Sequence, residues 1–314
     1  MKNKPLIEHA YGHGAIRANF FKHWFRKATQ KSLIKGLGFD WSKGFDVRDT
    51  IGSIEIKNQG SNSSCGGQSG SYFLEIQRRL QAIKEGACSA KSIYSPISYK
   101  GGGTTLIALQ GQIKGSGANL EAVVPSMVNG LPMIEAQITD KSWRTSALTE
   151  DALTRGGYVP YDIGTNIDDV ATAIQNYGAC IIEISGQNGH NPGWLSAYPC
   201  PPLPNNGQEI WNHFLCCCGA KIINGVKYAI ALESMGTSVG ENGIQYISEA
   251  YFQSGFVREA FTFMWDGNIY TPVKRPQSDW AYLADWFAGW FGLDKWLGYI
   301  KGLLGGMNTA PQAS

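Results

Sequence analysis

The chain contains 314 residues, with 27 lysines and arginines against 25 aspartates and glutamates, and 43% of its residues are apolar. A chain of this length buries about three quarters of the surface that its unfolded form exposes, so it can hold one large core or two smaller ones. Its aromatic content of 12% and charged content of 17% exclude a chain that is disordered throughout. A net charge of +2 gives no overall attraction to nucleic acid, and we expect no nucleic-acid partner.

Composition divides the chain into three regions. Residues 1–44 form a basic arm with paired aromatic side chains, residues 45–272 have the composition of a globular domain, and residues 273–314 begin at a proline-containing joint and end in a polar tail. The arm lacks the apolar run of about 7–15 residues that marks a secretory signal. We therefore expect a cytoplasmic or particle-associated protein.

The seven cysteines fit a reducing compartment with free thiols. An odd number leaves at least one thiol unpaired. Cys216, Cys217 and Cys218 are consecutive, and neighbours on a strand point to opposite faces, so they cannot easily pair with one another. We expect Cys216 and Cys218 to share one face and to be buried as small apolar residues. The sequence has no Cys-x-x-Cys pair, and we predict no metal site and no cofactor.

The first predicted helix follows Cys65. Apolar side chains recur after it at steps of four, four and three residues: Tyr72, Ile76, Leu80 and Ile83. This spacing places them on one face of a helix, and Gly86 is the predicted stop. Cys65 therefore lies at the N-terminus of the predicted helix.

A second helix and a series of strands follow. Residues Ile167–Gly178 show helical spacing and end in a glycine. Four apolar runs with strand character come next: Ala179–Ser185, His213–Ile223, Val226–Leu232 and Ile244–Ile247. The Asn224-Gly225 dipeptide predicts a hairpin turn. Helices that precede strands favour an α+β protein with an antiparallel sheet.

The position of Cys65 suits a nucleophile. The N-terminus of a helix carries about half a positive charge, which favours a thiolate over a thiol. A nucleophilic thiol also needs a base, and a histidine is the usual one. The alternative is that Cys65 is a small buried residue without a chemical role, as most cysteines are.

Four blocks of sequence resemble the papain-like cysteine peptidases. They are Asp46–Asp49 with Ile56–Cys65, Tyr94–Pro96 with Gly101–Gly103, Asn212–Leu215, and Leu232–Gly243. In that family a glutamine lies six residues before the nucleophilic cysteine, as Gln59 does before Cys65. Asn212-His213 likewise resembles the Asn-His pair at the family's catalytic histidine. Four blocks in the same order are much more specific than any one alone.

The resemblance implies a fold and a set of roles. The fold is α+β with two subdomains, a helical left half and an antiparallel, β-barrel-like right half, with a cleft between them. Cys65 is then the nucleophile, His213 the base, and Gln59 a donor to the oxyanion. Residues implied to bind a peptide or protein substrate are Gly101, Gly102, Gly103 and Asn212.

The sequence departs from the family in several places. Glu233 stands where the family has the asparagine that orients the catalytic imidazole. It either accepts a hydrogen bond from His213 or faces solvent and leaves that role to another group. Asn62 stands where a family cysteine usually begins a disulfide. Tryptophans that shield the family's catalytic pair are replaced at three positions: Gly66, Met235 and Val239.

Two readings of function follow from these residues. The first is a cysteine endopeptidase that hydrolyses peptide bonds through an acyl-enzyme, within a larger assembly such as a virus or phage particle. The second is a catalytically impaired structural or interaction subunit that is anchored through its N- and C-terminal extensions. A related Cys–His acyl transferase, of the transglutaminase type, is a third.

The C-terminal segment 279–306 is rich in tryptophan, tyrosine and phenylalanine, and its apolar residues approximate one helical face. It has no uninterrupted apolar run of about 18 residues, so it does not span a bilayer. We expect it to bind a protein partner. A membrane surface is a second possibility, and packing against its own domain is a third. The arm 1–44 either docks on another protein, wraps back on the domain, or covers the cleft.

Overall fold

The computed structural model describes residues 38–186, 194, 199–203 and 211–265. These belong to the first of two units in the chain, Met1–Tyr270, and the second unit, Thr271–Ser314, lies outside the described residues. The basic arm up to residue 37 and the aromatic segment 279–306 also lie outside them. The expected contacts of both extensions therefore stay predictions.

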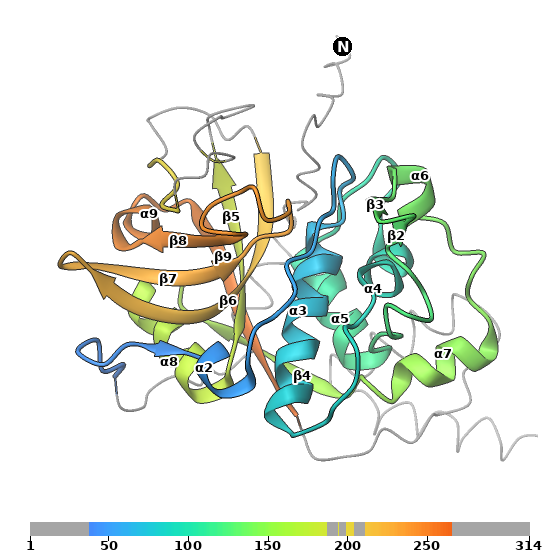
Figure 1. The fold of residues 1–314 in the computed structure, drawn as a ribbon, viewed down its shortest axis with the longest axis horizontal. Coiled ribbons are helices and arrows are strands. Elements are labelled where there is room, and N and C mark those ends of the chain that lie inside the picture. The colour runs from blue at the N-terminus through green and yellow to red at the C-terminus, as the bar shows by residue number, and fades with distance from the viewer. Residues whose placement is uncertain (1–37, 187–193, 195–198, 204–210, 266–314) are drawn as a thin grey trace, which may run out of the picture. The chain divides into compact units, whose positions relative to one another are not determined.

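Most of the helices gather on one side of the molecule (Figure 1). The central one is α3, Cys65–Leu80, which packs against α4, Ala90–Ile97, and α5, Leu106–Gly115. The other described helices are α2, Arg48–Ile51; α6, Glu135–Ile138; α7, Ser146–Leu153; α8, Ile167–Tyr177; and α9, Glu249–Gln253. None of the described helices is long and apolar enough to cross a membrane.

An antiparallel sheet forms the other side (Figure 1). Its strands are β1, Phe45–Asp46; β4, Tyr158–Ile163; β5, Cys180–Gly186; β6, Trp211–Ile223; β7, Val226–Leu232; β8, Ile244–Ser248; and β9, Val257–Trp265. The order is β4-β9-β5-β6-β7-β8, with β1 paired to β6. The predicted α+β class is confirmed. The sheet resembles a barrel without closing, since its edge strands β4 and β8 are not paired with each other in the described part of the chain.

The predicted strands are found within a residue or two of their expected ends. The hairpin between β6 and β7 turns at Asn224 and Gly225, whose φ angles of 50° and 80° fit the turn that this dipeptide favours. The long strands β4 and β9 were not predicted, nor were the two-residue strands β1, β2 (Met127–Val128) and β3 (Leu131–Pro132). Pro160 interrupts the strand pattern of β4, and it is tolerated because β4 lies at the edge of the sheet.

The first helix is shorter than predicted. It ends at Leu80 rather than at Gly86, because Ala82 adopts a left-handed φ of 58°. The N–H of Ile83 donates to the carbonyl of Arg78 at 2.9 Å, and that of Ala82 donates to Arg79 at 3.0 Å. These two bonds define a Schellman ending, in which glycine is the usual left-handed residue. Because this residue is an alanine, the sequence contains no signal for the helix end.

The two faces of β6 contribute to two apolar cores. Phe214, Cys216 and Cys218 pack in the core that α3 covers, and Leu215 and Cys217 pack in the core that α8 covers. The side chains alternate as expected on a strand. The predicted burial of Cys216 and Cys218 on one face is therefore confirmed, and all seven cysteines are free thiols.

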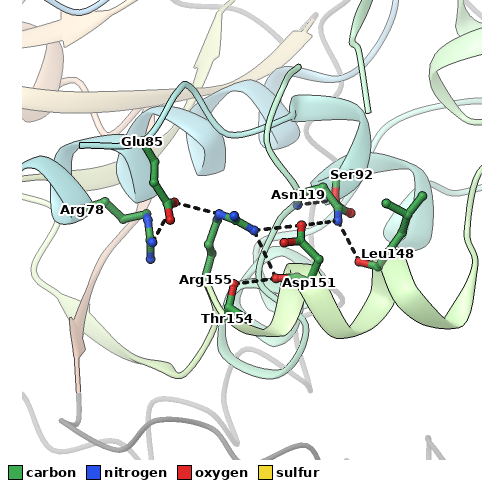
Figure 2. Close-up of polar contacts among 8 residues, drawn as sticks. All are labelled: Arg78, Glu85, Ser92, Asn119, Leu148, Asp151, Thr154 and Arg155. Atoms are coloured by element: carbon green, nitrogen blue, oxygen red, sulfur yellow. Dashed lines mark hydrogen bonds and ion pairs between the residues drawn. The ribbon is translucent and has the colours of Figure 1, made fainter. Parts of the chain in front are cut away.

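A polar network lies near the C-terminal end of α3 (Figure 2). Glu85 binds Arg78 at 2.7 Å and Arg155 at 2.9 Å, and Arg155 also binds Asp151 at 2.9 Å. Asn119 extends the network by donating to Asp151 at 2.9 Å. Because Asp151 belongs to α7, these bonds hold α7 against the end of α3.

A short hairpin stands beside the segment that leads into α3. It is formed by β2, Met127–Val128, and β3, Leu131–Pro132. A Cβ atom at Gly60 would lie 2.8 Å from the Pro132 side chain, so only a glycine permits this close approach. The hairpin therefore packs directly next to Gln59 and leads on to α6.

Candidate active site

Cys65 is the first residue of α3, as predicted, and its side chain is buried. The turn before it is held by Asn62, whose Oδ1 accepts from the Ser64 N–H at 3.0 Å. The Nδ2 of Asn62 donates to the carbonyl of Met133 at 2.7 Å. Asn62 thus fastens the turn to its neighbour by hydrogen bonds at the position where the family usually has a disulfide cysteine.

His213 and Glu233 meet beside this helix end. His213 lies near the start of β6, and Glu233 follows the last residue of β7. The imidazole Nε2 lies 2.8 Å from Glu233 Oε1, and neither side chain is exposed. A carboxylate can only accept, so Nε2 carries the proton in this contact. The other ring nitrogen, Nδ1, is left to interact with the Cys65 thiol.

The charge state of His213 follows from its neighbours. Burial by itself lowers the pKa of an imidazole. The negative charge of Glu233, together with hydrogen bonds to Cys65 and Glu233, outweighs burial and raises the pKa of His213 to about 10. The ring is therefore held as the cation, which is the form that stabilises a neighbouring thiolate.

The backbone of Glu233 is fixed from both sides. Its N–H donates to the carbonyl of Gly243 at 2.9 Å. Its carbonyl accepts from the Tyr72 hydroxyl at 2.7 Å, and that hydroxyl accepts from the Lys57 N–H at 2.6 Å. Tyr72 projects from α3, two turns beyond Cys65. One helix thus positions both the thiol and the residue that carries the carboxylate.

Gln59 lies in the same cluster. Its backbone N–H donates to the carbonyl of Ser234 at 2.7 Å, and its side-chain Oε1 accepts from the Ser234 hydroxyl at 2.5 Å. Its Nε2 donates to the carbonyl of Asn62 at 2.8 Å. Ser234 also donates its N–H to Glu233 Oε1 at 2.9 Å. Ser234 therefore links the glutamine to the carboxylate, a role that the sequence analysis did not predict.

The glycine segment adopts a backbone that few other residues could follow. Gly101, Gly102 and Gly103 have φ angles of 95°, 94° and 84°. The Gly103 N–H donates to the Tyr94 hydroxyl at 2.6 Å, and that hydroxyl donates to Glu135 Oε1 at 2.9 Å. Glu135 in α6 is a second residue that the sequence analysis missed. It lies far from the glycines in sequence, and no local pattern connects them.

Asn212 precedes His213 on β6, so their side chains point to opposite faces of the strand. The Oδ1 of Asn212 accepts from the Ser185 hydroxyl at 2.7 Å. The structure thus brings Cys65, His213, Glu233 and Gln59 together and ties the Asn212 side chain to β5. The substrate-binding role of Asn212 and of the glycines stays a prediction.

At Gly66, one of the three positions where the family has a tryptophan, the structure leaves no room for a side chain. A Cβ atom at Gly66 would lie 2.5 Å from the Thr104 side chain and 3.3 Å from Phe214. Two other indoles pack near the start of β6. Trp211 lies two residues before His213, on the same face of the strand, and its ring centroid is 5.0 Å from that of Trp194. The two-residue period from His213 could have identified Trp211.

Other sites are less suited to chemistry. In the described part of the chain, no group of three or more His, Cys, Asp or Glu side chains is arranged to hold a metal ion. A hollow of about 370 Å³ lies at the opposite end of α3, lined by residues such as Leu80, Tyr177 and Trp265. It contains no nucleophile and no base, so the Cys65 cluster is the better candidate.

Comparisons with known proteins agree with this geometry at the level of the fold. No family model and no curated protein matches the chain. Among solved structures, xylellain, a cysteine protease from Xylella fastidiosa, aligns with a TM-score of 0.64 at 14% identity, over 82% of this chain and 96% of xylellain. Bromelain from Ananas comosus aligns with a TM-score of 0.55 at 16% identity, over 71% of this chain and 99% of bromelain.

Procathepsin L 3 from the larval midgut of Tenebrio molitor aligns with a TM-score of 0.54 at 20% identity, over 74% of this chain and 75% of that one. These matches show that the chain has the fold of the papain-like cysteine proteases. The fold implied by the sequence resemblance is therefore confirmed.

Proposed function

We propose that the protein is a cysteine endopeptidase that cuts peptide bonds through Cys65 and His213. The observation that carries this proposal is the buried His213 ring, which bonds Glu233 on one side and Cys65 at a helix N-terminus on the other. A thiol, a base and a group that orients the base are the parts that nucleophilic catalysis requires.

The reaction begins when the Cys65 thiolate attacks the carbonyl carbon of the scissile bond. The imidazolium of His213 then gives its Nδ1 proton to the departing amine as the C–N bond breaks, and a thioester remains on Cys65. A water molecule attacks this thioester and passes a proton back to His213. The acid product leaves, and the Cys65–His213 pair is restored.

The negative oxygen that forms at each attack needs hydrogen-bond donors. The backbone N–H of Cys65 at the helix start is one candidate, and the side-chain amide of Gln59 is the other. Two bonds, to the Ser234 hydroxyl and the Asn62 carbonyl, hold that amide in place, and the backbone N–H of Gln59 is bound to the Ser234 carbonyl. A donor that is fixed before the reaction stabilises the transition state without further ordering.

Glu233 places a charged carboxylate where the papain-like family has the neutral amide of an asparagine. The carboxylate stabilises the imidazolium more strongly than an amide oxygen, and the rigid backbone of Glu233 compensates for the longer side chain by fixing where it starts. We expect the ion pair to persist to a higher pH than it would with an amide partner.

The test uses the full-length protein and internally quenched peptides, with products identified by mass spectrometry. We expect cleavage at internal bonds, its loss in Cys65→Ala, and labelling of Cys65 by an epoxysuccinyl inhibitor such as E64. The matched control is Cys200→Ala, which removes a half-buried thiol outside the cluster. Failure to cut any peptide, with no labelling of Cys65, would refute the proposal.

One observation favours a second candidate. The side chains of Cys65 and His213 are both fully buried, so a substrate cannot reach them without some displacement of the chain. A papain-like interaction subunit within a larger assembly needs no such access. This candidate predicts that Cys65→Ala leaves partner binding unchanged and that Cys65 resists the inhibitor.

A further inference from the structure

Glu135 places a carboxylate beside the turn that leads to the nucleophile. Its Oε2 accepts from the Ser63 N–H at 2.6 Å, and its Oε1 accepts from the Tyr94 hydroxyl at 2.9 Å. Ser63 lies two residues before Cys65, and two residues of chain span no more than about 7 Å. The carboxylate therefore lies within the reach of a long side chain from the residue that is being cleaved.

The same carboxylate lies against the glycine segment. A Cβ atom at Gly102 would lie 3.1 Å from Glu135 Oε1 and 2.8 Å from the Ser63 hydroxyl. Burial, and after it the negative charge of Glu135, raises the pKa of Tyr94 far above its usual range, and the charge of Cys65 acts in the same direction. Glu135 and Cys65 thus act electrostatically on the same phenol.

Among the described residues Glu135 has no counter-ion, unlike Glu75 and Glu85. Glu75 pairs with Lys57 at 3.6 Å and with Arg79 at 2.6 Å, and Glu85 pairs with two arginines. Within the described ranges, no lysine, arginine or histidine forms an ion pair with Glu135, which is half-buried. Its two donors in the described part of the chain, the Ser63 N–H and the Tyr94 hydroxyl, are neutral, so no described cation balances its negative charge.

We infer that Glu135 selects substrates with a positively charged side chain, arginine or lysine, at one of the two positions before the cleaved bond. The cation would sit over Ser63 and Gly102 and complete the coordination of the carboxylate. Bonds between a guanidinium and a carboxylate are charge-assisted and specific in geometry. This inference rests on the proposed peptidase function, because it assigns a preference to the same site.

A purely structural role for Glu135 is the competing explanation. Its bonds to Ser63 and Tyr94 brace the turn and the glycine segment, and loss of the brace would weaken the binding of every peptide alike. A specificity role changes the ratio between charged and neutral peptides instead. The ratio is therefore the quantity to measure.

The experiment compares peptides that are identical except for Arg, Leu or Glu at each of the two positions before the cut. Hydrolysis is followed with the full-length protein, and binding is followed by fluorescence anisotropy with full-length Cys65→Ala. We expect Arg to exceed Leu by about tenfold at one position, which corresponds to about 1.4 kcal/mol. Glu135→Gln should reduce this ratio to less than about threefold.

Two controls isolate the local charge. Glu150→Gln removes one negative charge from the exposed surface of α7 and should leave the Arg-to-Leu ratio unchanged. For the unmodified protein, the ratio should fall as salt rises from about 0.05 to 0.5 M, because ions screen a partly exposed pair. This second control needs no substitution and stands even if Glu135→Gln is unstable.

The outcomes separate this inference from the proposed function. Cleavage without a preference for Arg, or a preference that Glu135→Gln preserves, overturns the inference and leaves the peptidase intact. An equal loss for all peptides in Glu135→Gln also overturns it in favour of the brace. Binding that prefers Arg without any cleavage overturns the peptidase and supports the acidic subsite.

Discussion

Helix α3 has an ion-pair cluster near each end, and the two clusters differ in burial and in the nature of the cation. Near the N-terminal end, His213 and Glu233 are unexposed and 2.8 Å apart. Near the C-terminal end, Arg78 and Arg155 bind Glu85 and Asp151, whose side chains are 28% and 40% exposed (Figure 2). The first pair is shielded from water, and the second is partly screened by it.

The difference shows what each cluster is suited to do. A guanidinium keeps its charge at every accessible pH, so the far cluster can only hold elements together. An imidazolium exists at neutral pH only when its neighbours favour it, and it can give its proton away. The cluster to which we assign chemistry therefore uses the titratable cation, and the cluster that supports α7 uses the permanent one.

Removal of Glu233, at the His213 end of α3, should have the largest effect. We expect Glu233→Ala to lower kcat/KM about 10³-fold, because a buried imidazole loses both its orienting group and its counter-charge. Glu233→Gln keeps an acceptor and should lose only about tenfold. The alkaline limb of its pH–rate profile should move to lower pH. Equal kinetics for the two variants would show that the carboxylate charge has no role.

Gln59→Ala tests the neighbouring donor and should have the next largest effect. Loss of one oxyanion donor typically raises the barrier by about 3 kcal/mol, or about 10²-fold in kcat. We expect KM to change little, since the donor acts on the transition state. Gln112→Ala serves as the control, because it removes a buried amide that donates to Gly117 and lies away from the cluster. A loss that appears in KM alone would argue against an oxyanion role.

Arg155→Met should affect stability and leave catalysis alone. The substitution removes the cation that joins Glu85 to Asp151, and partial exposure limits the cost to about 1–2 kcal/mol. Chemical denaturation measures this loss, while kcat/KM should stay within about twofold. Arg144→Met, on an exposed residue, should cost less than about 0.5 kcal/mol. A large drop in kcat/KM would mean that the two ends of α3 are coupled.

The smallest expected effect concerns how folding stability depends on pH, because His213 and Glu85 contribute dependences of opposite sign. The folded pKa of His213 lies above its usual 6.5, so its stabilisation is complete below about 6.5 and is lost as the pH rises toward about 10. The folded pKa of Glu85 lies below its usual 4.5, because bonds to Arg78 and Arg155 outweigh burial. Its stabilisation is present above 4.5 and is lost in acid. Denaturation curves for Glu233→Gln and Glu85→Gln should show losses at opposite ends of the pH range.

The sequence predicted best those parts of the site that depend on local spacing. The helix start at Cys65 was found from the spacing of apolar residues, and the hairpin at Asn224 was found from its dipeptide. Gln59 was implied by the family resemblance. The family resemblance placed Glu233 at the position that orients the imidazole but left open whether it bonds His213 or faces solvent, and the structure shows the bond. Each of these has a signal that neighbouring residues or a known motif supply.

The parts that escaped prediction depend on contacts between distant segments. Ser63 and Glu135 are 72 positions apart, and their bond depends on how the β2–β3 hairpin returns to the turn before Cys65. The packing of Trp194 against Trp211 likewise joins two segments that no local pattern connects. The end of α3 at Leu80 escaped for a different reason, because Ala82 takes the left-handed position of the capping turn that glycine usually fills.

The most direct test of the account is the rate at which each thiol is alkylated as a function of pH. Iodoacetamide is applied to the full-length protein, modified residues are mapped by mass spectrometry, and Cys65→Ala is treated in parallel. If His213 holds Cys65 as a thiolate, Cys65 should react selectively at about pH 6, well below the ordinary thiol pKa of about 8.5. If Cys65 reacts no faster than Cys88 or Cys200 throughout the range, the thiolate–imidazolium pair does not exist and the proposed activity falls with it.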